Sequence, residues 1–154
     1  MPDLLTHWAA ARVPATFLRD RRLQALLVLG TFLPDVGSKG LDLVARAPSY
    51  FDDPTHSFVG LALLCYGASL FLAIDLRRGG FAALYAGAVV HLLVDVIKDN
   101  LGGGGMRIFL PFSLAEVELG LIYTQNVVFL APLDVLVLLA CGLVERRRRR
   151  ALLR

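Results

Sequence analysis

A histidine and an aspartate stand four residues apart inside an apolar stretch of the chain, at His91 and Asp95. Residues four apart in a helix lie on the same face, one above the other. Ionisable side chains inside a membrane segment are energetically costly and commonly mark a functional site. Imidazole and carboxylate groups are also ligands that divalent metals accept. The pair therefore predicts half of a metal site.

Three other side chains of the same two kinds are candidates to complete that site, namely His7, Asp35 and His56. Imidazole and carboxylate bind Zn²⁺ well and also accept Mn²⁺ or Fe²⁺. The set fits one ion with carboxylates around it, or two ions that share an aspartate. Such a site would lower the pKa of water and polarise a phosphoryl or carbonyl oxygen. The predicted chemistry is metal-dependent hydrolysis.

Four more side chains are candidates for a direct part in that chemistry. Asp52, Asp53 and Glu116 could each act as a general base without binding the metal. Arg107 could neutralise a substrate phosphate. Asp134 lies inside the last apolar run, where it either hydrogen-bonds a neighbouring helix or supports the metal ligands. For Asp134 we favour the structural role.

The composition predicts the frame that holds these residues. Of the 154 residues, 56% are hydrophobic, above the roughly 45–50% of soluble domains. The excess gathers in three runs of about the length that spans a bilayer, residues 58–76, 81–97 and 127–144. Two shorter helices are expected before them, within residues 1–18 and 23–36. We therefore predict one all-α domain over residues 1–154, a polytopic integral membrane helical bundle.

Two connecting segments carry their own predictions. Residues 37–53 are rich in polar side chains and are expected to form an irregular loop. Ser113 followed by Glu116 fits a capping box that would open a helix near Leu114. The two cysteines, Cys65 and Cys141, lie in apolar runs without a CxxC pair, so we expect them to be buried hydrophobic residues.

The arginines predict how the chain sits in the membrane. They cluster in residues 19–22, 77–78 and 146–150, next to the apolar runs. Basic residues that flank membrane segments favour the cytoplasmic side. This places the C-terminus in the cytoplasm and the candidate metal ligands toward the outer side of the cytoplasmic (inner) membrane. The clusters lack interleaved aromatic and polar base-reading residues, so we expect no nucleic-acid partner.

In this order the motifs resemble the YdjM-like family, the LexA-regulated, membrane-bound, predicted metal-dependent hydrolases of bacteria and archaea. The resemblance runs from Met1 to about Ile122 and depends on Met1-Pro-Asp-Leu-Leu-Thr-His7, Gly30-Thr-Phe-Leu-Pro-Asp35, Thr55-His56-Ser57, His91-Leu-Leu-Val-Asp95 and a glycine-rich stretch before Phe109-Leu-Pro-Phe112. It implies that His7, Asp35, His56, His91 and Asp95 are the metal ligands. The chain departs from the family around Lys98 and Phe109, so its substrate contacts are expected to differ.

Together these observations predict a membrane-embedded hydrolase with a divalent metal, with Zn²⁺ preferred. A site at this depth suits an ester or phosphoester of a lipid-like substrate at the outer leaflet, and membrane lipids are the expected partners. The alternative is a non-enzymatic membrane protein, either a metal transporter or a structural subunit. Small residues in 58–76 and 81–97 permit close helix packing, within the chain or in a homo-oligomer.

Overall fold

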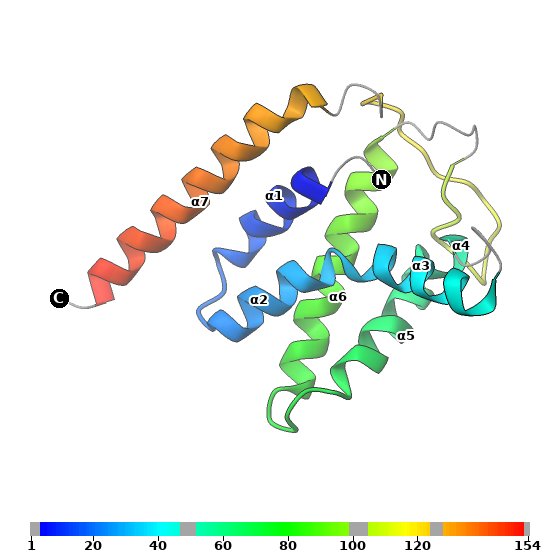
Figure 1. Ribbon diagram of the computed structural model, residues 1–154, viewed down its shortest axis with the longest axis horizontal. Coiled ribbons are helices and arrows are strands. Elements are labelled where there is room, and N and C mark those ends of the chain that lie inside the picture. The colour runs from blue at the N-terminus through cyan, green and yellow to red at the C-terminus, as the bar shows by residue number, and fades with distance from the viewer. Residues whose placement is uncertain (1–3, 47–51, 99–104, 124–127, 153–154) are drawn as a thin grey trace.

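The computed structural model describes residues 4–46, 52–98, 105–123 and 128–152, and in these ranges the regular elements are helices (Figure 1). The helices are α1 (Leu4–Ala15), α2 (Arg21–Gly30), α3 (Leu33–Ala45), α4 (Asp52–Thr55), α5 (Phe58–Ser69), α6 (Arg77–Ile97) and α7 (Ala131–Leu152). Two helical stretches, Arg77–Ile97 and Val128–Arg148, are long and apolar enough to cross a membrane. The predicted all-α class is confirmed.

Helix α6 is the centre of the packing. Helices α1, α2, α3 and α5 all contact it. Its buried face carries small residues in its first half, among them Gly80, Ala83 and Gly87, and then His91 and Leu92. Small side chains let neighbouring helices approach closely. The first half of α6 is therefore a packing surface, and its second half brings polar chemistry into the same buried layer.

Reciprocal glycine contacts hold α2 against α6. A Cβ atom built on Gly87 would lie 1.9 Å from the carbonyl oxygen of Leu27, and one on Gly30 would lie 2.1 Å from that of Leu84. The two backbones are thus in direct contact, which only glycine permits at these points. This crossing sets the end of α2, and with it the start of α3, beside the second half of α6.

The prediction that residues 37–53 form an irregular loop is wrong for residues 37–45, which belong to helix α3. Residues 47–51 lie outside the described ranges. Helix α3 runs to Ala45, and Arg46 ends it with a left-handed φ of 51°. Pro34 occupies its first turn, where the missing N–H has no partner to lose. The proline therefore starts a second helix as well as separating it from the first, and it places Asp35 near the start of α3.

The apolar run at 58–76 forms a shorter helix than predicted. Helix α5 has 12 residues, about 18 Å at 1.5 Å per residue, which is well short of a hydrocarbon core of about 30 Å. The Ser69 hydroxyl donates to the Tyr66 carbonyl at 2.7 Å, and the Leu70 N–H is shared between the carbonyls of Tyr66 and Gly67. These local bonds tighten the last turn and end the helix. Within the described residues, two long candidate spans replace the predicted three.

Residues 105–123 contain no helix, so the helix predicted near Leu114 is wrong. Met106 and Val117 exchange two backbone hydrogen bonds of 3.0 Å each, and the Leu119 N–H donates to the Val96 carbonyl at 2.8 Å. The Phe58 N–H donates to the Ile108 carbonyl at 3.0 Å. The segment's backbone groups are thus paired with other parts of the chain, and the segment lies against the end of α6.

Helix α7 packs against α1 and is tied to it by a polar contact near each end. The Thr6 hydroxyl donates to Asp134 at 2.6 Å, and Arg12 Nη2 donates to Glu145 Oε1 at 2.8 Å. Only 11% of the 18-residue apolar stretch of α7 is buried within the chain. Asp134 therefore has the structural contact that we favoured, and most of α7 is left to face its surroundings.

The glycine crossing gives a direct stability prediction. Gly87→Ala places a methyl group against backbone, so we expect the free energy of unfolding to fall by about 1–3 kcal/mol. The control is Gly67→Ala on α5, where a Cβ meets nothing within 4 Å and alanine is the better helix former. Thermal unfolding in detergent compares the two variants, and equal midpoints would contradict the backbone contact.

Candidate metal centre

The predicted pair on α6 is in contact, with His91 buried and Asp95 partly exposed. His91 is 1% exposed, and its Nε2 atom lies 2.9 Å from Asp95 Oδ2. The i, i+4 spacing places the two side chains on one helix face as expected. The neighbouring residues Leu92 and Val96 belong to the buried apolar core.

The other three predicted ligands reach this pair from three other segments. His7 comes from α1, Asp35 from the first turn of α3, and His56 from the residue after α4. The measured separations are 3.1 Å from His7 Nε2 to Asp95 Oδ1, 3.3 Å from His56 Nε2 to His91 Nε2, and 3.7 Å from His56 Nε2 to Asp35 Oδ1. The fold thus brings all five predicted side chains into one cluster.

The cluster contains two overlapping triads, His7–His91–Asp95 and Asp35–His56–His91, each with ligand atoms within 4.8 Å of one another. Two ligands bound at about 2.0–2.1 Å to a tetrahedral zinc lie about 3.4 Å apart. The donor atoms of His91 and Asp95 are 2.9 Å apart and those of His91 and Asp35 are 4.0 Å apart, and no pair within a triad exceeds 4.8 Å. The donor atoms and their spacing therefore fit a divalent metal.

His91 Nε2 is the nitrogen that the two triads share. It faces Asp95 Oδ2 at 2.9 Å, His56 Nε2 at 3.3 Å and Asp35 Oδ1 at 4.0 Å. An imidazole nitrogen has either one hydrogen or one free lone pair, so a proton there serves the contact with Asp95 alone, whereas a cation bound by the lone pair could be shared with the other ligand atoms. Because one lone pair binds one ion, the shared nitrogen also favours a single ion held by both triads.

The Nδ1 atoms of His56 and His91, which are the ring nitrogens that face away from the cluster, differ in their contacts. Thr55 Oγ1 lies 3.3 Å from His56 Nδ1, a contact that holds the ring with Nε2 toward the cluster. His91 Nδ1 and Thr31 Oγ1 are both buried without a hydrogen-bond partner in the described part of the chain. The backbone nitrogen of Thr31 lies 3.0 Å from the Cβ position of Gly87, one turn before His91.

The carboxylate of Asp35 is held in its charged form. Burial raises its pKa and is the largest single effect, but the hydrogen bond with His56 and the charges of His91 and His56 together outweigh it. The pKa of Asp35 therefore lies below its ordinary value. A charged carboxylate is the form that binds a metal.

Lys98, which the sequence analysis did not identify as a site residue, adds a positive charge beside Asp95. Lys98 follows α6 and is buried, and its Nζ donates to Asp95 Oδ1 at 3.0 Å. The signal in the sequence was its position three residues after the aspartate, which places the two on one side of the helix end. Lys98 offsets one carboxylate charge and competes with a metal for Asp95.

The residues predicted to take part in catalysis lie outside both triads. Arg107 binds Asp53 Oδ2 at 3.2 Å and Glu116 Oε1 at 3.1 Å, and all three side chains are exposed by more than 40%. Asp52 belongs to α4, and its side chain lies outside the described part of the structure. The roles of Asp52, Asp53, Glu116 and Arg107 stay predictions, and Arg107 could bind a phosphate only by sharing or leaving these carboxylates.

Comparison with known proteins gives one match. The sequence model of a family described as YdjM inner membrane protein matches residues 3–153. No curated protein and no solved structure matches the chain. The family match extends the motif resemblance, which ended near residue 122, through the C-terminal helix.

The contact between Lys98 and Asp95 makes a prediction about metal affinity. Lys98→Met removes a positive charge beside the cluster, so we expect a divalent ion to bind about tenfold more tightly, because Coulomb repulsion is lost. Lys39→Met, at an exposed position of α3, is the matched control and should leave affinity unchanged. Competition with a chromophoric zinc chelator measures both, and weaker binding by Lys98→Met would overturn this account of Lys98.

Proposed function

Because the chain belongs to the YdjM family of inner membrane proteins, we propose that it is a membrane-embedded, metal-dependent hydrolase. The observation that carries the proposal is the convergence of three buried imidazoles and two partly buried carboxylates on one small volume. Buried ionisable groups in a membrane protein are rare and usually functional. A cluster that served packing alone could be built from apolar residues at lower cost.

The proposed cofactor is one divalent ion, with Zn²⁺ preferred and Mn²⁺ or Fe²⁺ also suited to nitrogen and oxygen donors. His7, His56 and His91 would supply nitrogen, and Asp35 and Asp95 would supply oxygen. When bound, such an ion acts as a Lewis acid that lowers the pKa of water and polarises a phosphoryl or carbonyl oxygen.

The residues around the ligands have proposed tasks of their own. Lys98 places an ammonium beside Asp95 and would bind an anionic oxygen of the substrate. Leu61, Leu92 and Val96 belong to the apolar core next to the cluster and would limit the entry of water. Asp52, Asp53 and Glu116 keep the proposed role of general base, although Asp53 and Glu116 would have to leave their ion pairs with Arg107 to perform it.

A lipid-like phosphoester is the proposed substrate. The cluster lies on the second half of α6, 13 residues from Arg78, which is about 20 Å along a helix. If the basic ends lie in the cytoplasm, the cluster lies toward the outer leaflet, where a lipid's scissile bond could reach it with its chains in the bilayer. The positive charge of Lys98 favours a phosphoester over a neutral ester.

A metal transporter is the competing function, and the first half of α6 argues against it. A transport path needs polar side chains that continue through the membrane. The buried face of that half carries Gly80, Ala83, Leu84, Gly87 and Ala88. This apolar, close-packed face favours an ion that stays in place as a cofactor.

Metal content tests the cofactor. We expect about one equivalent of zinc, manganese or iron in the detergent-purified protein and almost none in the double variant His91→Ala, Asp95→Ala, because it disrupts both triads. Asp75→Ala removes an exposed aspartate and should keep the metal. Elemental analysis after resupply of divalent ions makes the comparison. An unchanged content in the double variant would remove the metal site, and two equivalents would require Asp95 to bridge two ions.

Hydrolysis tests the reaction. We expect the purified, metal-loaded protein to release phosphate or a headgroup from phospholipid or isoprenoid-phosphate substrates, and His91→Ala to lower the rate at least a hundredfold, because His91 belongs to both triads. Asp75→Ala again serves as the control. If His91→Ala hydrolyses these substrates as fast as the unaltered protein, the proposed mechanism fails even where metal is bound.

A further inference from the structure

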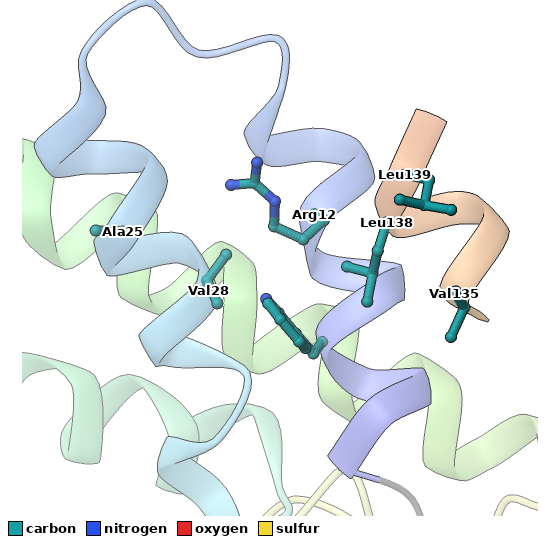
Figure 2. Close-up of a pocket in the computed structure, with 7 residues that line it drawn as sticks. Arg12, Ala25, Val28, Val135, Leu138 and Leu139 are labelled. Atoms are coloured by element: carbon teal, nitrogen blue, oxygen red, sulfur yellow. The ribbon is translucent and has the colours of Figure 1, made fainter. Parts of the chain in front are cut away.

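A second concave site lies apart from the metal centre, between α1, α2 and α7 (Figure 2). Its volume is about 510 Å³, within the range of about 300–1,000 Å³ that is usual for small-molecule sites. It is a groove lined mainly by Trp8 and Arg12 of α1, Ala25 and Val28 of α2, and Leu138 and Leu139 of α7. With the exception of Arg12 and the indole N–H of Trp8, this lining is apolar.

The setting of the groove favours hydrocarbon over water. One wall is α7, a candidate membrane span with only 11% of its apolar window buried in the chain. The chain belongs to an inner membrane family, so the exposed leucines along α7 face acyl chains. A groove that opens beside such a helix is filled at low cost by an acyl chain.

Arg12 supplies the polar end of the groove. Its Nη2 donates to Glu145, and within the described residues this is the hydrogen bond that its guanidinium makes. A guanidinium has five N–H donors in a planar fork that matches a phosphate. Figure 2 shows Arg12 reaching from α1 into the space that Val28 also faces.

More positive charge surrounds this end. Arg148 comes from α7, donates to the Thr16 carbonyl and lies over the Phe17 ring at 5.8 Å. The arginines of 19–22 follow α1 directly. A negatively charged headgroup near the end of α1 would therefore meet complementary charge, whereas the other end of the groove, near Val135, is apolar.

We propose that this groove binds one anionic glycerophospholipid, with its phosphate on Arg12 and one acyl chain between α1, α2 and α7. The chain runs past Val28, Leu138 and Leu139 toward Trp8. The lipid acts as a bound structural ligand that joins α7 to the α1–α2 pair. This site does not depend on the metal or on hydrolysis.

Trp8 makes the proposal measurable, because it is the chain's single tryptophan. Its fluorescence is quenched when a brominated acyl chain touches it. Detergent-solubilised protein is titrated with brominated phosphatidylglycerol and, separately, with brominated phosphatidylcholine. We expect saturable quenching, with half-saturation at a concentration at least tenfold lower for the anionic lipid. His91→Ala should give the same curves, which separates this test from that of the hydrolase.

Three variants locate the lipid. The double variant Arg12→Gln, Glu145→Gln removes the phosphate contact without leaving an unpaired carboxylate, and it should abolish the tenfold preference. Val28→Phe fills the groove and should reduce quenching by both lipids. Arg78→Gln, an exposed arginine at the start of α6 and outside the lining of the groove, should behave like the unaltered protein.

Two outcomes overturn the proposal. Quenching that does not saturate, or that is the same for both lipids and all variants, means that Trp8 meets only bulk lipid or detergent. Protection of Trp8 from both lipids in a sample that light scattering shows to be dimeric means that a second copy of the chain covers the groove. A thermal unfolding midpoint in detergent close to that of the unaltered protein verifies that the fold of each variant is intact.

Discussion

The rest of this structure depends on the contact of two partly buried carboxylates, Asp35 and Asp95, with three buried imidazoles. Taking a charge out of water costs several kcal/mol even after the protein relaxes, and a membrane offers fewer means of compensation than a soluble interior. Lys98 offsets part of the charge of Asp95, and Asp35 is held by His56 and His91. A divalent cation would offset what remains and would satisfy the nitrogen lone pairs at the same time.

The packing of the helices brings those groups together. His7 and Asp95 are 88 positions apart in sequence, yet their side chains lie 3.1 Å apart. The contact depends on α1 packing against α6, while Asp35 depends on the glycine crossing that sets α2 and the start of α3 against α6. A substitution that shifts the helix packing far from the ligands would therefore disturb the metal centre by changing the distances between its ligand atoms.

The sequence predicted what depends on local spacing. His91 and Asp95 share a face because of helix geometry, and the apolar runs at 81–97 and 127–144 are long candidate helices because of their length. It did not predict that local bonds of Ser69 and Leu70 end α5 early. It also did not predict what depends on contacts across the chain, such as the hydrogen bond from the Leu119 N–H to the Val96 carbonyl at the end of α6. Lys98 was overlooked because a lysine after a helix usually has a solvated side chain, and only its burial beside Asp95 sets it apart.

The proposed function depends on one ion held by imidazole and carboxylate at the junction of the two triads. X-ray absorption at the zinc edge of the zinc-loaded protein tests this most directly. We expect nitrogen and oxygen neighbours at about 2.0–2.2 Å, with the multiple-scattering signature of imidazole and without a second metal nearby. Sulfur neighbours at about 2.3 Å, or a spectrum that His91→Ala leaves unchanged, would place the metal elsewhere and contradict the account.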